Sequence, residues 1–143
     1  MMKDITVQPN ITIKQAMKAL DKTAEKCLLV VDDNKKLLGT LTDGDLRRSI
    51  LAGAKFTENI SNSYTTKPTV LKQDEYNPEK AKVLLRKHNV NMIPIVNENN
   101  IVVDYVTWSG LGEEIKPHKS SLNVPVVIMA GGRGTRLEPF TKV

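Results

Sequence analysis

The spacing of apolar residues changes along the first fifty positions, from helical spacing in some segments to continuous runs in others. Residues 5–7 predict a short strand, and Thr12 then precedes apolar residues at helical spacing, which are Ile13, Ala16, Met17 and Leu20. A threonine in front of such a stripe is typical of a capped amphipathic helix. Residues 27–31 are all apolar and predict a buried strand.

The next residues complete the same unit. The polar run 32–35 predicts a turn, residues 37–41 predict a second strand, and Asp43 begins a helix through Leu51. Leu46 and Ile50 are the residues of this helix that we expect to face inward. The predicted order of elements is therefore β-α-β-β-α.

This unit occurs twice. When the chain is aligned with itself at an offset of 65 residues, Thr42 falls on Thr107 and Leu46 on Leu111 without a gap. Other matched positions are Ile5 with Val70, Ala16 with Ala81, Leu20 with Leu85, Leu29 with Pro94, and Val31 with Val96. We therefore expect two half-domains of similar shape.

The second copy predicts its own elements. They are a strand at 69–71, a helix from Asn77 and Pro78 through Ala81, Leu84 and Leu85, strands at 92–96 and 101–107 around a turn at 97–100, and a short helix ending near Gly110 to Gly112. Proline at the first helical position suits a helix start, because its missing N–H has no partner there in any case.

Two segments carry a resemblance to a known family. They are Gly39-Thr-Leu-Thr-Asp-Gly-Asp-Leu46 in the first copy and Ile93-Pro-Ile-Val96 in the second, and with the repeat they resemble a pair of CBS motifs. The resemblance covers about residues 1–113. It implies a mixed α/β (α+β) fold with pseudo-two-fold symmetry, motifs at 1–60 and 61–113, two clefts for adenine nucleotides such as AMP, ADP or ATP, and a homodimer.

Thr42 and Asp45 are the principal candidate ligand residues. They match the family's Ser/Thr-x-x-Asp motif at a strand-to-helix corner. A carboxylate there can accept hydrogen bonds from ribose hydroxyls, while the threonine and the helix amides meet a phosphate. The alternative interpretation is that the two residues only cap the following helix.

The second cleft lacks this carboxylate. Thr107 is kept, but Gly110 stands where the second aspartate would be, so we expect weak nucleotide binding or none. Trp108 either stacks on a base or packs at an interface. By resemblance, the residues just before the second strand of each copy surround a ligand, which nominates Lys26, Cys27, Val90 and Asn91. Cys27 lies in an apolar strand, and we interpret it as a core thiol.

The end of the sequence carries different chemistry. Val126 to Ala130 is an apolar run, and Gly131, Gly132 and Gly134 follow it beside two arginines. This pattern predicts a buried strand that leads into a glycine-rich loop able to hold phosphate.

Residues 129–141 resemble the signature that opens the catalytic domain of sugar-phosphate nucleotidylyltransferases. The resemblance implies that a nucleoside triphosphate is held by Gly131, Gly132, Gly134, Thr135 and Arg136, with Arg136 as the catalytic candidate and Mg²⁺ as the cofactor of the parent enzyme. We expect a linker at 114–123 and a truncated catalytic piece at 124–143. One strand cannot form a catalytic sheet, so the chain itself is not expected to be an enzyme.

Composition narrows the classes of function. The chain has 143 residues, of which 40% are hydrophobic and 26% charged, which favours a folded globular protein without a membrane span. The net charge of +5 is scattered, so we expect no nucleic-acid partner. One cysteine and no signal segment favour the cytoplasm. His88 and His118 lack partners at metal-ligand spacing, so no metal or other cofactor is expected in the chain itself.

Two hypotheses follow. In the first, the chain is a regulatory module that senses an adenine nucleotide through Thr42 and Asp45 and biases an attached nucleotidylyltransferase domain. In the second, it is a dimerisation module whose cleft binds no nucleotide and whose Asp45 only caps a helix.

Overall fold

The two copies of the repeat form two stacked halves. The structure is a computed structural model that describes residues 5–23 and 25–111. The first half contains, in chain order, β1 (Thr6–Val7), α1 (Ile13–Thr23), β2 (Cys27–Val31), β3 (Leu37–Thr42) and α2 (Asp43–Leu51). The second contains β4 (Leu71–Lys72), α3 (Pro78–His88), β5 (Met92–Val96) and β6 (Val102–Thr107), and ends in the 3₁₀ helix η3 (Ser109–Leu111).

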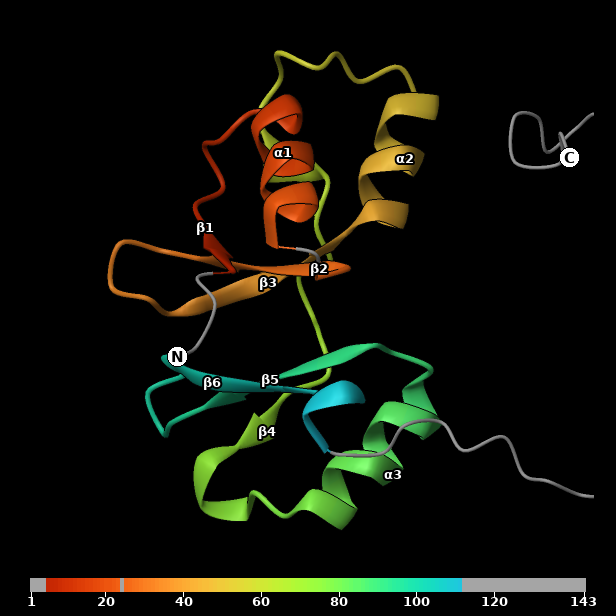
Figure 1. The fold of residues 1–143 in the computed structure, drawn as a ribbon. Helices are drawn as coiled ribbons and strands as arrows, with labels where there is room; N and C mark the ends of the chain where they lie inside the picture. Colours follow the sequence, from red (N-terminus) through yellow and green to blue (C-terminus); the bar gives the residue numbers. More distant parts are fainter. Residues whose placement is uncertain (1–4, 24, 112–143) are drawn as a thin grey trace, which may run out of the picture.

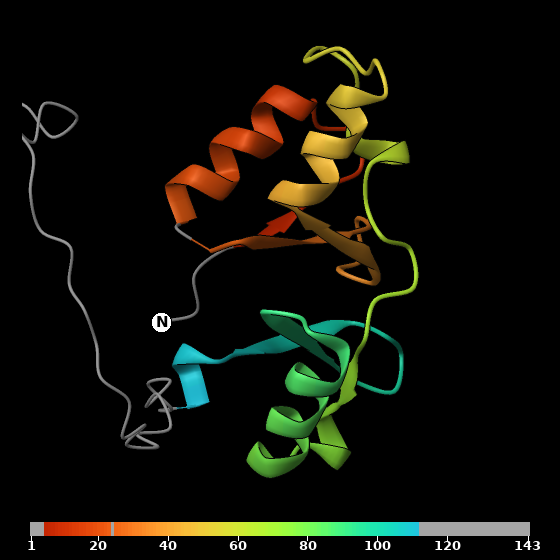
Figure 2. The ribbon, with the colours of Figure 1, turned by 90° about the vertical axis from the view of Figure 1, so that its right-hand side faces the viewer.

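Each half has one three-stranded sheet. The strand orders are β1-β2-β3 and β4-β5-β6, in which the first strand is parallel and the last antiparallel to the central one. Figures 1 and 2 show the two sheets facing each other in the middle of the molecule, with the helices on the outer faces. The mixed α+β class and the paired repeat are confirmed.

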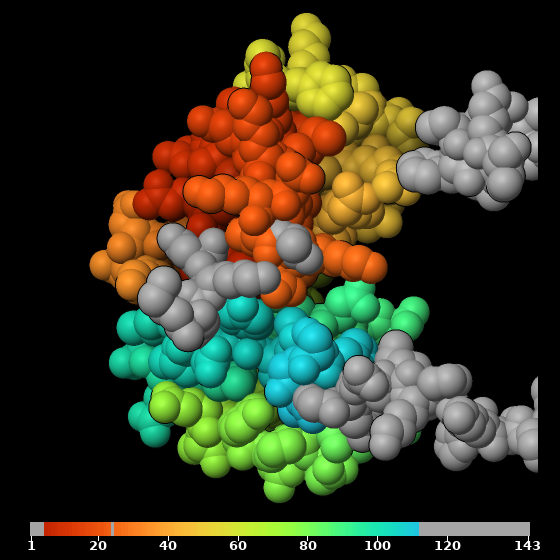
Figure 3. All heavy atoms as spheres, viewed as in Figure 1, coloured from red at the N-terminus to blue at the C-terminus, as the bar shows by residue number. Residues whose placement is uncertain are grey.

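The core lies between the sheets and under the helices. Every residue of β2 and of β5 is buried, because one face of each strand meets the helices and the other meets the opposite sheet. The main apolar cluster crosses the boundary between the halves, since it contains Met92 and Val96 along with Leu28 and Leu41. Figure 3 shows the two halves in contact along this boundary.

The turns of the two hairpins bind to each other. The N–H of Leu37 donates to the carbonyl of Asn100 at 2.9 Å, and the N–H of Val102 donates to the carbonyl of Lys35 at 3.1 Å. The two bonds join equivalent residues of the repeat, because Val102 and Asn100 lie 65 positions after Leu37 and Lys35, as a pseudo-two-fold axis requires. Lys35 and Asn100 also share a left-handed backbone, each with φ of 61°. The halves are therefore tied at the turn end of their sheets.

The structure corrects three details of the sequence analysis. Met17 is 39% exposed, because it lies at the edge of the stripe through which Ile13, Ala16 and Leu20 face the sheet. The strand expected at 69–71 is Leu71–Lys72. In place of the expected short helix, the described part of the second copy has a 3₁₀ turn, Ser109–Leu111, at the position where α2 begins in the first copy.

Two short 3₁₀ helices were not predicted. They are η1 (Ile60–Asn62) and η2 (Gln73–Glu75), and each lies in a connection where no apolar period marks it. The motif boundaries at 1–60 and 61–113 stay predictions. The predicted linker at 114–123 and the catalytic piece at 124–143 lie outside the described residues.

The connection between the halves crosses the edge of the first sheet at Gly39. Thr40 and Thr65 exchange backbone hydrogen bonds of 3.0 and 2.9 Å beside it. A Cβ on Gly39 would lie 2.5 Å from the ring of Tyr64 and still closer to the Thr65 carbonyl. Only glycine leaves room for this crossing.

We predict that Gly39→Ala lowers the free energy of unfolding by about 1–3 kcal/mol, because the crossing strand must move away. Urea denaturation followed by circular dichroism measures this. Gly110→Ala is the control, since a Cβ there would lie at an ordinary 3.4 Å from the Thr107 hydroxyl. Equal denaturation midpoints for the two variants would contradict the prediction.

Candidate functional site

The corner between β3 and α2 is a complete capping box. Thr42 ends β3 and is the N-cap of α2, and its hydroxyl accepts from the Asp45 N–H at 3.2 Å. Oδ2 of Asp45 accepts in return from the N–H of Thr42 at 2.8 Å and from its hydroxyl at 2.6 Å. The capping role that the sequence left open is therefore present.

The cap uses only one carboxylate oxygen of Asp45. Oδ1 accepts instead from Nη2 of Arg48 at 2.6 Å. The Asp45 side chain is 13% exposed and that of Arg48 is 72% exposed. The corner thus holds a nearly buried carboxylate whose second oxygen is covered by a side chain that is itself mostly in water.

A pocket opens where the two halves meet. It has a volume of about 280 Å³, and the lining residues are Glu25, Lys26, Cys27, Asn91, Met92, Thr107, Trp108 and Ser109. The pocket lies at the end of the sheets opposite the joined turns, because Cys27 pairs with Thr42 and Met92 with Thr107 across the hairpins.

Three of the nominated residues meet in this pocket. Lys26 and Cys27 reach it from the start of β2, and Asn91 reaches it from the residue before β5. Val90 packs instead against the core of the second half. Thr42 and Asp45 do not line the pocket, although Thr42 is the strand partner of Cys27.

The pocket therefore lies on the side of the second corner, to which the sequence analysis gave the lesser role. There the Thr107 hydroxyl accepts from the N–H of Gly110 at 3.2 Å and lies 3.0 Å from the Ser109 hydroxyl. Gly110 supplies no carboxylate at this corner. Trp108 both lines the pocket and packs against the core of the second half, so the structure supports its packing role without removing it from the pocket.

Cys27 is a buried thiol of low reactivity. Its side chain lies in the main core, and burial, followed by the charge of Asp45, raises the pKa of the thiol from 9.0 to about 12. A thiol needs to lose its proton to act as a nucleophile. The interpretation of Cys27 as a core residue is confirmed.

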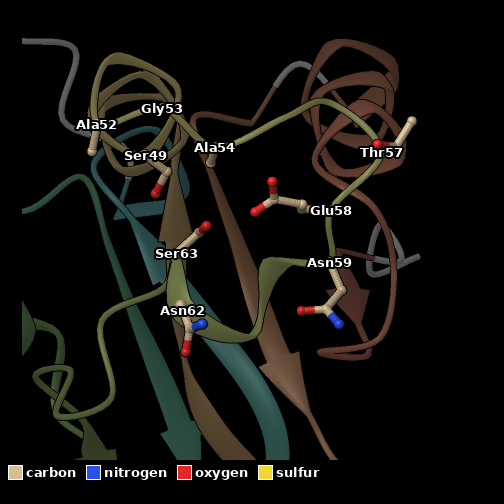
Figure 4. Close-up of a pocket in the computed structure, with 9 residues that line it drawn as sticks. All are labelled: Ser49, Ala52, Gly53, Ala54, Thr57, Glu58, Asn59, Asn62 and Ser63. Atoms are coloured by element: carbon tan, nitrogen blue, oxygen red, sulfur yellow. The ribbon is translucent and has the colours of Figure 1, made fainter.

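A second pocket lies at the other end of α2 (Figure 4). Its volume is about 680 Å³, and the side chains of Ser49, Glu58 and Ser63 point into it. Its lining residues include one carboxylate and no basic side chain, which is unfavourable for a phosphate. None of the residues nominated from the sequence lies there.

The remaining expectations concern the glycine-rich segment, metal sites and membrane-spanning helices. Gly131, Gly132, Gly134, Thr135 and Arg136 lie outside the part of the chain that the structure describes. Within residues 5–23 and 25–111, no three His, Cys, Asp or Glu side chains gather as a metal site would require. None of the helices in these residues has the length and apolar character needed to cross a membrane.

Comparison with known proteins identifies the fold. Residues 1–52 match the family model of the CBS domain. The structure also matches the CBS domain pair of protein MJ0100 solved with 5′-methylthioadenosine and S-adenosyl-L-methionine, with a TM-score of 0.67 over 78% of this chain and 87% of that one at 24% identity. The described residues have the fold of a CBS-domain pair. CBSX2 in complex with AMP is another such match, with a TM-score of 0.65 over 75% of this chain and 83% of that one at 24% identity.

The chain is also similar to part of a longer curated protein. Arabinose 5-phosphate isomerase GutQ of Escherichia coli O6:H1 is 33% identical to this chain over 88 residues. The match covers 62% of this chain but only 27% of the relative. The chain thus spans about a quarter of this relative's length, and the match leaves the activity of the whole protein open.

We predict that the stability of this CBS pair falls as the pH rises above 9. Below that pH the thiol is protonated in both states. Between pH 9 and about 12 the unfolded chain loses the proton of Cys27 while the folded one keeps it, which costs up to about 1.4 kcal/mol per pH unit.

Urea unfolding at pH 8.0 and 10.5 measures this slope, and Cys27→Ala is the reference for all other groups that titrate there. Identical slopes for the two proteins would show that the thiol is not held protonated by the fold.

Proposed function

We propose that this CBS pair is a regulatory module that binds an adenine nucleotide at the end of the sheets where Lys26, Cys27, Asn91 and the Thr42–Asp45 corner lie together. The observation that carries the proposal is the nearly buried Asp45 carboxylate, whose cap occupies Oδ2 and leaves Oδ1 to an exposed arginine. Two proteins of the same fold were solved with such ligands, CBSX2 with AMP and MJ0100 with S-adenosyl-L-methionine, which supports this ligand class.

Three groups have a chemical role in this proposal: Asp45, the start of α2 and Lys26. Oδ1 of Asp45 accepts hydrogen bonds from ribose hydroxyls. The first N–H groups of α2 carry partial positive charge toward a phosphate, and Lys26 adds a full charge from β2. Because residues of both halves surround the ligand, binding changes the free-energy difference between arrangements of the halves. That difference is the signal passed to an attached domain.

We also propose that the attached domain is a sugar-phosphate nucleotidylyltransferase. The support is the signature at residues 129–141, with Arg136 in the glycine-rich loop. In this proposal the parent protein transfers a nucleotidyl group to a sugar 1-phosphate with Mg²⁺, and pyrophosphate leaves. The relation to GutQ neither favours nor opposes it, because that match covers only 27% of the relative.

An alternative function has one observation in its favour. Every described polar contact of Asp45 is internal, as it would be in a dimerisation module that uses the residue only as a cap. Asp45→Ala separates the two functions, because only the regulatory module would lose nucleotide binding with it.

Calorimetric titration with AMP, ADP, ATP and S-adenosylmethionine tests the nucleotide site. We expect saturable binding of at least one of them near one ligand per chain, and its loss in Asp45→Ala, which also loses about 1 kcal/mol of stability with the cap. Asp43→Ala is the matched control, because Asp43 lies in the same helical turn but pairs with Arg47 at the surface. An absence of heat with all four ligands would favour the dimerisation module.

The proposed parent activity has its own test. We expect the full-length protein to release pyrophosphate from a nucleoside triphosphate in the presence of a sugar 1-phosphate and Mg²⁺, measured with a coupled phosphate assay across a panel of both substrates. Arg136→Ala should lower the rate by at least about tenfold because a charged phosphate contact is lost. Equal rates for the two proteins would argue against a catalytic Arg136.

A further inference from the structure

The side chain of Arg48 folds back over the first turn of α2. Its Nη2 donates to Oδ1 of Asp45 at 2.6 Å. A Cβ built on Gly44 would lie 3.3 Å from Nη1 and 3.8 Å from Nη2, so the guanidinium lies directly above Gly44. The guanidinium therefore covers Oδ1 of Asp45 and the start of α2, which are the two groups of this corner that a nucleotide would use.

This cover is held weakly, while the carboxylate under it is held firmly. Arg48 is 72% exposed and pairs with Asp45, whereas Asp45 is 13% exposed and is fixed by two bonds to Thr42. Ion pairs with an exposed partner contribute between about 0 and 1 kcal/mol. The guanidinium can leave without disturbing the capping box.

The described residues of the opposite corner differ at the carboxylate. There Gly110 takes the place of Asp45, and an open pocket lies beside Thr107 and Ser109. Asp45, in contrast, lines neither of the two pockets described above. The corner that has the carboxylate is the one that an arginine closes.

We propose that Arg48 is the residue that makes the Asp45 site select phosphorylated nucleosides over free nucleosides. In the empty site Arg48 occupies Oδ1 of Asp45. A ribose displaces it, and the released guanidinium pairs with the phosphate on the same sugar. The inference rests on the proposed nucleotide site and adds its selectivity.

The chemistry of the two partners supports this exchange. A guanidinium presents two parallel N–H groups to a phosphate as readily as to a carboxylate, so the charge that leaves Asp45 is satisfied again. The phosphate also meets the partial positive charge at the start of α2. A nucleoside without a phosphate displaces the same arginine but gives it no new partner.

Calorimetry with AMP and adenosine on the unsubstituted chain and on Arg48→Met tests this proposal. Because charged hydrogen bonds to the phosphate are lost, we expect the variant to bind AMP at least about tenfold more weakly. It should bind adenosine about two- to fivefold more tightly, since the competing ion pair is gone. The preference for AMP over adenosine should therefore fall by at least about twentyfold, the product of the two changes.

Arg47→Met is the matched control. Arg47 is the neighbouring residue of α2 and makes an ion pair of the same length, 2.6 Å, with Asp43, in which both side chains are exposed. Arg47→Met removes the same charge from the same helix as Arg48→Met does. We expect this control to leave the ratio of AMP to adenosine affinity within about twofold of the original. An equal loss of selectivity in both variants would mean that net charge alone is responsible, and would overturn the role of Arg48.

The remaining outcomes are also decisive. If AMP binds and Arg48→Met keeps the original preference, the guanidinium does not reach the phosphate and the proposal is wrong. If the unsubstituted chain binds neither ligand, the nucleotide site itself fails, which is a different result. Cooperative urea unfolding of both methionine variants, with midpoints close to that of the original chain, confirms that both are folded.

Discussion

The two sheets must cover each other, and the remaining architecture follows from this requirement. β2 and β5 are apolar at every position, so each needs a cover on both faces. The helices of one repeat cover only one face of its central strand. The second face is covered by the other repeat, which is why Met92 and Val96 belong to the same apolar cluster as Leu28. One repeat alone would leave this surface in water.

Burial between two similar sheets also determines where a ligand can enter. At the turn end, the hairpins join through reciprocal bonds of Leu37 and Val102. At the other end, the strands begin at Cys27 and Met92 and stop at Thr42 and Thr107, which leaves the polar corners and the pocket. The candidate ligand residues Lys26, Cys27 and Asn91 therefore lie at the end of the sheets that the core does not fill.

Much of this fold is predictable from the sequence. Continuous apolar runs gave the bounds of β2 and β5, and the offset of 65 residues related every strand of one half to a strand of the other. The capping motif at Thr42 and Asp45 is also local, since it depends on residues three apart.

Other features depend on contacts that no local pattern contains. Met17 has the right spacing for a core residue but lies at the edge of the covered stripe. The bond between Arg48 and Asp45 joins a long side chain to an oxygen that could have been left to water. The pocket beside Thr107 needs residues from both repeats, so its position could not be deduced from either copy.

The joined turns have a mechanical consequence. A strand of five residues is about 17 Å long, so if the halves tilt with the joined end as a pivot, the open end is the far tip of a lever. A rotation of about 5° at the pivot displaces the tip by about 1.5 Å, half the length of a hydrogen bond. A small tilt that leaves every bond at the turns intact is thus enough to make or break polar contacts across the open end.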